Sequence, residues 1–352
     1  MRVGLGYLNM APAGDAATTQ ATFDDFFQDV QWADDKGFAG IWVTEHHFST
    51  YSLTSSPLLL LAKASALAPR LRLGTSILVL PFWDPVRLSA DVLSLDALSS
   101  GRFDLGIGRG YQPHEFLGFG RNPDDNRAIF EEAVDVVMQL FTERDNDFHG
   151  KYTSIDAPVT LLPRPTQAPH PPIWMAATSR ESLAFAARRG FHFMLPAVTT
   201  YEEIVQRRAW IEEETTAQGG LGQREFQVNR FVYCGEDEEG RREVVREIAR
   251  QLQTSAALTR GTYPVLGDAP APTAIDPGLE AKAEGVLVSG SPEQVLAEFR
   301  RLAEAGITYV IAGFNFGYLR KEIAQKSMER FAAEVLPHLD GLGGPHGAGG
   351  AS

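Results

Sequence analysis

The strongest constraint on the fold of this chain is a repeated alternation of short apolar runs with longer segments of helical periodicity. Apolar runs occupy residues 3–8, 40–44, 71–80 and 103–107, and apolar residues at three- and four-residue spacing follow each run. About eight such units succeed one another along the chain, which predicts an α/β fold with parallel strands and crossover helices. Eight units over 352 residues favour a closed (β/α)8 TIM barrel over a doubly wound open sheet.

The same periodicities place the remaining elements. We expect further strands over 173–176, 193–195, 226–234 and 309–312. Helices are expected over 23–36, 57–68, 85–98, 126–143, 179–188, 201–216, 238–254, 291–305 and 321–335.

Three segments fit no element of such a barrel. Residues 148–165 contain prolines and alternate in polarity, which predicts an inserted hairpin or loop. Residues 259–290 are rich in Pro, Gly and Ala and are too long for an ordinary connection, which predicts a lid or a disordered loop. The tail at 339–352 has low complexity and is expected to be disordered, so residues 1–338 are expected to form a single barrel domain.

Charge and composition exclude several classes of protein. The net charge of −13 argues against a nucleic-acid partner. The apolar run that begins at Pro57 is far shorter than the roughly 20 residues of a membrane span, and Lys63 interrupts it. A single cysteine, Cys234, leaves no internal disulfide, and no signal peptide is apparent, so we expect a cytoplasmic protein without a membrane partner.

Polar side chains stand where the chemistry of a barrel lies, at the carboxyl ends of the strands. Arg109 follows the fourth strand between two glycines, and Ser179 and Ser182 stand at the start of a helix after the fifth. A fixed cation and a helix N-terminus can together bind a phosphate. The alternative is that Arg109 pairs with a carboxylate at the rim and Ser179 is only an N-cap. The run 106–110, GIGRG, lacks the spacing of a dinucleotide fingerprint.

The second strand ends in Glu45-His46-His47, which allows three interpretations. A metal site is disfavoured, because consecutive residues of a strand point to opposite faces. One histidine can instead be a hydrogen-bonded packing residue, which we favour for His47. One imidazole can act as a general acid or base, because its pKa near neutrality suits proton transfer.

Five blocks of sequence, in order and at matching spacing, resemble the bacterial luciferase-like flavin-dependent monooxygenases. They cover nearly the whole chain apart from its tail. The blocks are WVTEHHF (42–48), LGTSILVLPFWDPVRLSADVLSLDALSSGRFDLGIGRG (73–110), NRAIFEE (126–132), ATSRESLAFAARRG (177–190) and SGSPEQVLAEFRRLAEAGITYVIAGF (289–314).

The resemblance implies a (β/α) barrel that binds reduced FMN, activates O2 as a flavin hydroperoxide and oxidises a small organic substrate. It implies that Glu45 is an acid beside the flavin ring, that His46 is catalytic, and that Ser76 and Ile77 are joined by a cis peptide under the ring. The resemblance also makes residues 259–290 a mobile lid. The cofactor-binding residues that it implies, apart from Glu45, are Ser76, Ile77, Arg109, Tyr111, Arg127, Ser179 and Ser182.

Alternatives remain open at this point. Some relatives transfer a hydride with a deazaflavin, and luciferase has a non-catalytic flavin-binding subunit. Because no NAD(P)H fingerprint is visible, a separate NAD(P)H:flavin reductase is expected to supply reduced FMN, and the family suggests a homodimer. Gly108 and the bulkier Ile77 depart from the bioluminescent members, so light emission is not expected. Candidate substrate-wall residues are Phe82, Trp83, Tyr111, Phe116, Trp174 and Phe314.

Overall fold

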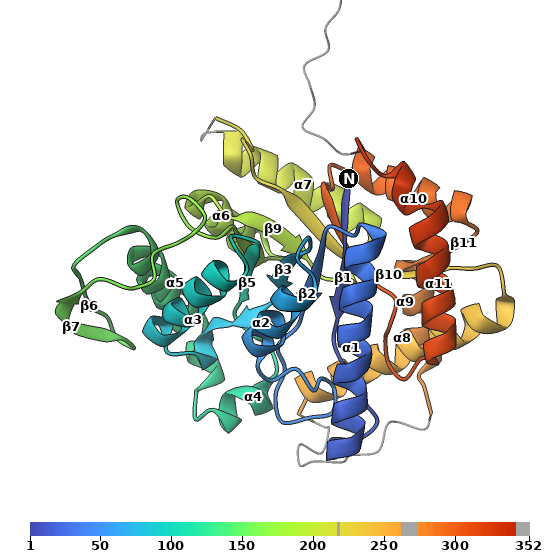
Figure 1. Cartoon of the computed structure of the whole chain (residues 1–352), viewed down its shortest axis with the longest axis horizontal. Helices are drawn as coiled ribbons and strands as arrows, with labels where there is room; N and C mark the ends of the chain where they lie inside the picture. Colours follow the sequence, from blue (N-terminus) through green and yellow to red (C-terminus); the bar gives the residue numbers. More distant parts are fainter. Residues whose placement is uncertain (217–218, 262–273, 343–352) are drawn as a thin grey trace, which may run out of the picture.

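The computed structural model describes residues 1–216, 219–261 and 274–342. Within them, parallel strands close into a ring surrounded by helices, as Figure 1 shows. The ring runs in the order β1 (Arg2–Tyr7), β2 (Gly40–Val43), β3 (Arg72–Thr75), β5 (Phe103–Gly108), β8 (Ile173–Ala176), β9 (His192–Leu195), β10 (Phe226–Cys234) and β12 (Tyr309–Gly313), which returns to β1. The predicted (β/α)8 barrel is confirmed.

The predicted helices lie close to their expected positions, and a short helix over residues 113–118 was not predicted. The largest difference between a predicted and an observed helix is at the start of α1, which begins at Ala16 rather than at residue 23. The Asp15 carboxylate caps the helix there, because it accepts hydrogen bonds from the amides of Ala17 and Thr18. Gly37, with φ of 85°, ends it. Apart from one helix described below, the α-helices of the described residues are α1 (Ala16–Lys36), α2 (Pro57–Leu67), α3 (Pro85–Leu98), α4 (Pro113–Gly118), α5 (Asn126–Thr142), α6 (Arg180–Arg189), α7 (Tyr201–Thr216), α8 (Glu238–Thr259), α10 (Pro292–Glu304) and α11 (Lys321–Glu334).

Large side chains fill the inside of the barrel. Trp42, Trp174 and Tyr309 pack edge to face, with the Trp42 and Trp174 rings 5.6 Å apart, and Met194 and Ile311 complete the cluster. The Trp42 indole donates to the Tyr309 hydroxyl at 2.9 Å, so the buried polar atoms are paired. The barrel therefore has a solid floor, and a ligand can enter only above it, at the carboxyl ends of the strands.

The predicted third strand over 71–80 is interrupted. It comprises β3, a second short strand β4 (Leu78–Val79) and the 3₁₀ turn η1 (Leu80–Phe82), and both strands pair with β5. The peptide bond between Ser76 and Ile77 is cis and lies at the interruption. Apolar patterning continues through both pieces, which is why the sequence reads as one strand.

The prediction for 259–290 is wrong over its second half. Residues 277–286 form α9 (Pro277–Val286), which Asp276 caps, and 287–290 form β11 (Leu287–Gly290). β11 pairs in parallel with the carboxyl half of β10, beyond the closed ring. A proline at the first helical position starts a helix, so the Pro-rich composition concealed the element. Residues 262–273 of the predicted lid lie outside the described residues.

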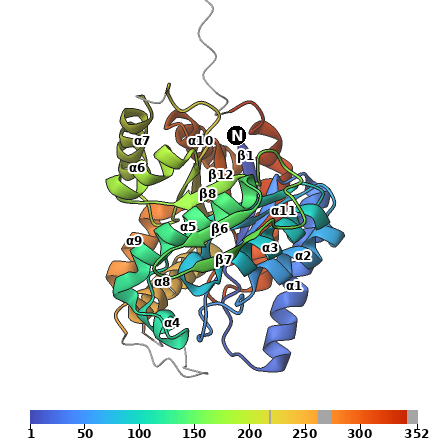
Figure 2. The ribbon, with the colours of Figure 1, turned by 90° about the vertical axis from the view of Figure 1, so that its left-hand side faces the viewer.

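Two predictions at the edges of the barrel have different outcomes. The inserted hairpin is confirmed as the antiparallel pair β6 (Asn146–His149) and β7 (Ser154–Val159), which faces the viewer in Figure 2. The tail does not begin at Leu339, because that residue is 1% exposed and its carbonyl accepts from the Met1 amine at 2.7 Å. Residues 343–352 lie outside the described residues. No described helix has the length and apolarity that crossing a membrane requires.

Candidate active site

Small side chains form the top inward layer of the barrel. Gly6 on β1 and Gly313 on β12 line the cavity at the mouth, and Gly108 on β5 lies next to Ala176 on β8. A Cβ at Gly108 would lie 2.8 Å from the Ile77 side chain. Larger residues at these positions would fill the mouth of the barrel, so the sequence leaves a hollow above the aromatic floor. The residues that line this cavity include Gly6, Thr44, Ser76, Asn229, Gln251, Gly313 and Phe316.

Polar atoms without partners face this mouth. The amide oxygens of Asn229 and Gln251 are buried, and neither has a hydrogen-bond partner in the described part of the protein. Gln227, two residues before Asn229 on β10, is fully buried with neither end of its amide paired. Each unpaired buried group costs roughly 1–3 kcal/mol. The Ser76 hydroxyl accepts from Asn229 at 3.2 Å. The mouth therefore offers hydrogen bonds to the polar edge of a ligand.

A second, smaller pocket brings together the four residues expected at the phosphate. Arg109 follows β5, Arg127 lies in the first turn of α5, and Ser179 and Ser182 form a capping box at the start of α6. Arg127 forms an ion pair with Glu131 at 2.8 Å. Across residues 1–216, 219–261 and 274–342, Arg109 makes no ion pair, which contradicts the alternative that it pairs with a rim carboxylate. This pocket has the donors of an anion site.

Glu45 and His47 form a closed pair behind the mouth. His47 Nε2 lies 2.8 Å from Glu45 Oε1, and the carboxylate also accepts from the Val79 amide at 2.6 Å and the Trp83 indole at 3.0 Å. Glu45 is 2% exposed and does not line the mouth cavity. Glu45 thus anchors the tip of β2 from a buried position, and its expected place beside the ring stays a prediction. His47 is the hydrogen-bonded packing residue that we favoured.

His46 points to a different carboxylate. Its Nδ1 lies 3.0 Å from Glu115 Oε1, and its ring contacts Tyr51 and Tyr111 at centroid distances of 4.9 and 6.0 Å. Burial raises the pKa of both tyrosines, so their hydroxyls stay protonated at neutral pH. The Tyr111 hydroxyl lies 3.3 Å from that of Ser255 on α8, although half of the Tyr111 side chain is exposed. His46 thus has the surroundings of a group that exchanges a proton.

Glu115 is the residue that sequence reasoning missed. It belongs to α4, a helix of six residues that follows the predicted anion arginine, and it is 1% exposed. Its partner is 69 residues away, so no spacing motif joins the two. The signal that was available is positional: an acid shortly after the end of a barrel strand.

The candidate substrate-wall residues mostly serve other purposes. Trp174 is a correction, because it lies in the barrel floor, stacked on His192 at 4.5 Å. Phe314 is a second correction, because it points outward and packs on Phe331 of α11 at 5.3 Å. Trp83 binds Glu45. Phe82 and Phe116 pack against each other at 4.8 Å, and only Tyr111 lies against the candidate catalytic histidine.

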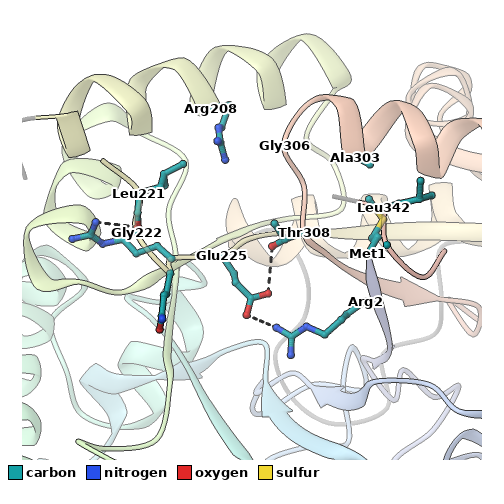
Figure 3. Close-up of a pocket in the computed structure, with 13 residues that line it drawn as sticks. Met1, Arg2, Arg208, Leu221, Gly222, Glu225, Ala303, Gly306, Thr308 and Leu342 are labelled. Carbon is teal, nitrogen blue, oxygen red and sulfur yellow. Dashed lines mark hydrogen bonds and ion pairs between the residues drawn. The ribbon is translucent and has the colours of Figure 1, made fainter. Parts of the chain in front are cut away.

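A larger cavity lies at the opposite end of the barrel. It measures about 660 Å³ and surrounds the amino ends of β1 and β12, as Figure 3 shows. Arg2 and Glu225 point toward each other there, and Arg208 pairs with Glu212 outside it. Arg2 and Glu225 pair with each other, and Arg208 has an acidic partner outside the cavity, so we place the candidate site at the carboxyl end. Within the described ranges, no three His, Cys, Asp or Glu side chains gather closely enough to hold a metal ion.

Comparison with known proteins places the chain in a family. The family model described as luciferase-like monooxygenase matches residues 1–309. The oxygenase component of the flavin-dependent trigonelline monooxygenase of Acinetobacter baylyi is 30% identical over 59% of this chain and 57% of its own length. Limonene 1,2-monooxygenase of Rhodococcus erythropolis is 28% identical over 90% of this chain and 81% of its own. The matches to the first three curated relatives span 45–58% of those proteins.

Solved structures agree on the fold. The monooxygenase RslO1 of Streptomyces bottropensis superposes with a TM-score of 0.84 at 28% identity, over 96% of this chain and 99% of that one. An F420-dependent secondary alcohol dehydrogenase superposes at 0.73 with 17% identity, over 95% and 98% of the two chains, which shows a shared fold alone. Since the family model covers most of its residues, the chain belongs to the luciferase-like monooxygenase family.

Proposed function

We propose that this protein is an oxidoreductase that uses reduced FMN and O2 to oxidise a small organic substrate. The observation that carries the proposal is the coexistence of an anion pocket after β5 and β8 with a polar hollow at the mouth of the same barrel. A phosphate bound in the anion pocket and a flat ring bound in the hollow would be the two ends of one FMN molecule. Monooxygenase relatives of this chain support the reaction class.

The residues present fit that cofactor at both ends. Arg109, whose charge is unpaired in the described part of the chain, and the N-terminus of α6 would hold the phosphate dianion. Ser76, Ile77 and the unpaired amide oxygen of Asn229 would lie against the ring, whose edge carries both donors and acceptors. When bound, reduced FMN would supply the electrons with which O2 is activated.

The chain's own part in the chemistry falls to His46. The Glu115 carboxylate would hold its Nδ1 proton, so Nε2 would accept or return a proton at the substrate. The Tyr51 and Tyr111 rings would help to exclude water from this nitrogen. The presence of a complete histidine–carboxylate pair argues against a non-catalytic flavin-binding subunit.

Partners follow from the same proposal. The relative in Acinetobacter baylyi is called an oxygenase component, which supports a separate NAD(P)H:flavin reductase as the source of reduced FMN here.

We also propose a homodimer through α2 and α3. Leu59 on α2 is 71% exposed and Leu98 on α3 is 68% exposed, and covering these leucines in a dimer would remove apolar surface from water.

The phosphate assignment gives a direct prediction. Replacing Arg109 by methionine should weaken FMN binding by about 10- to 100-fold, since a hydrogen bond to a charged group contributes about 1.5–3 kcal/mol. Riboflavin, which lacks the phosphate, should bind both proteins equally. Arg87→Met is the matched control, because Arg87 is a surface arginine paired with Asp91. Equal losses for FMN and riboflavin would contradict the assignment.

The cofactor is tested by mixing the anaerobic protein and reduced FMN with oxygenated buffer in a stopped-flow spectrometer. We expect an absorbance band that belongs to neither reduced nor oxidised FMN and that outlasts the reaction of free FMN. Deazaflavin is the second candidate, because an F420-dependent enzyme shares the fold. Tight binding of that cofactor, with FMN binding weakly and showing no such band, would replace the proposal by hydride transfer.

A further inference from the structure

We propose that Glu115 is a positioning residue: its carboxylate fixes which ring nitrogen of His46 carries the proton and leaves the other nitrogen open. The geometry stands on the described contacts alone. Its consequence for catalysis rests on the proposed function.

The first support is the way α4 holds the tip of β2. Glu115 Oε1 accepts from the His47 amide at 2.8 Å and lies 3.0 Å from His46 Nδ1. On the same helix, His114 Nε2 lies 3.1 Å from the His47 carbonyl oxygen, so it donates to that carbonyl. Two successive residues of α4 therefore fix both backbone polar groups of His47, and one of them also fixes the neighbouring imidazole. Such contacts leave the ring little freedom to rotate.

The second support is the chemistry of the pair. An ionised carboxylate only accepts, so Nδ1 of His46 must carry the hydrogen, and the lone pair of the neutral ring is then on Nε2. Across the part of the chain that the structure describes, Nε2 has no hydrogen-bond partner. Tyr51 and Tyr111 face the ring with hydroxyls that burial keeps protonated. The nearby His114 has its pKa lowered by burial, so at neutral pH it adds no competing charge.

The neighbouring pair shows what a purely structural arrangement looks like here. Glu45 binds Nε2 of His47 rather than Nδ1, and the same carboxylate also holds a backbone amide and an indole. The His47 ring is packed among Phe48, Phe82 and Phe119. The two pairs have the same chemical composition, but phenylalanine rings surround the His47 imidazole, whereas two tyrosine rings face the imidazole of His46.

The consequence is a defined proton position. A proton taken from a ligand would bond to Nε2 of His46, the Nδ1 proton would stay in place, and the Glu115 carboxylate would remain ionised and stabilise the imidazolium. Returning the proton reverses the step, so no additional reactant is needed.

The test is nitrogen NMR on the full chain labelled with ¹⁵N-histidine, without flavin. The two-bond proton–nitrogen correlation distinguishes the two neutral tautomers, and His46→Asn identifies the signals of His46. At pH 8 we expect His46 in the Nδ1–H form. In Glu115→Met, a side chain of similar size without an acceptor, we expect a change to a mixture or to the Nε2–H form. Glu45→Gln is the matched control and should change the signals of His47 instead.

A second variant is needed in case the Glu115→Met protein does not fold. Glu115→Gln keeps an acceptor for the His47 amide and removes only the charge, so the protonation equilibrium of His46 should shift about tenfold toward the neutral ring. His46 in the Nε2–H form in the unaltered protein, or signals that neither variant moves, would overturn the proposal. Expected NMR results without FMN-dependent turnover would instead refute the proposed function and leave the positioning role intact.

Discussion

Replacing His46 by glutamine is expected to lower kcat by about 10²- to 10⁴-fold, the usual contribution of a general acid or base. Glutamine resembles histidine in size and can still hydrogen-bond to Glu115, but it cannot take up a proton. FMN affinity should change little, because the phosphate contacts lie in a separate pocket. The measurement is steady-state turnover of a substrate that the unaltered protein accepts, with FMN binding followed by fluorescence.

His47→Gln is the control for that experiment. His47 is as buried as His46 and also pairs with a carboxylate, through Nε2 rather than Nδ1, but aromatic rings enclose it. Its replacement should lower the free energy of unfolding by about 1–3 kcal/mol, the usual effect of disturbing a buried polar pair. It should affect kcat far less than His46→Gln does. Comparable turnover by His46→Gln and the unaltered protein would remove His46 from the chemistry.

Replacing Gly106 by alanine is expected to destabilise the barrel by about 3 kcal/mol or more, the upper range of overpacking effects. A Cβ at this inward position of β5 would lie 1.7 Å from the Thr75 carbonyl oxygen. The backbone cannot easily move aside, because the Thr75 hydroxyl donates to the Gly106 carbonyl at 2.8 Å and accepts from its amide at 2.9 Å. Urea denaturation followed by circular dichroism measures the loss.

Gly285→Ala is the matched control for that substitution. Gly285 lies in α9, and a Cβ there meets no atom within 4 Å. Alanine should leave the unfolding free energy unchanged or raise it by about 0.5–1 kcal/mol, because alanine is the better helix former. If both variants were equally stable, the close approach of β3 and β5 at Gly106 would be wrong.

Local chemistry explains which elements the sequence predicted well. α3 and α7 begin and end where the periodicity placed them, because proline, capping residues and an apolar stripe act within a few residues. β10 was also predicted in full. The same local rules misled at 259–290, where composition indicated a loop and Asp276 with Pro277 started a helix. The hydrophobic pattern of the sequence cannot show that β11 pairs with the carboxyl half of β10.

The candidate site likewise contains residues that the sequence predicted and contacts that it could not predict. Arg109, Ser179 and Ser182 were identifiable because a barrel places the residues that follow its strands on one rim. The separate partners of Glu45 and His46 were not, because they depend on side-chain directions at the tip of β2. Glu115 reaches that tip from a helix 69 residues along the chain, and no periodicity encodes such a distance.

The sequence by itself determined the barrel, since the alternation of strand and helix recurs along the chain and each unit must bury its apolar face against the next. It also determined the rim on which the polar residues gather. Only the tertiary structure decided which carboxylate each of the two adjacent histidines binds, and through which ring nitrogen. That choice depends on packing between distant segments: aromatic side chains enclose His47, whereas α4 supplies His46 with a carboxylate on one side only.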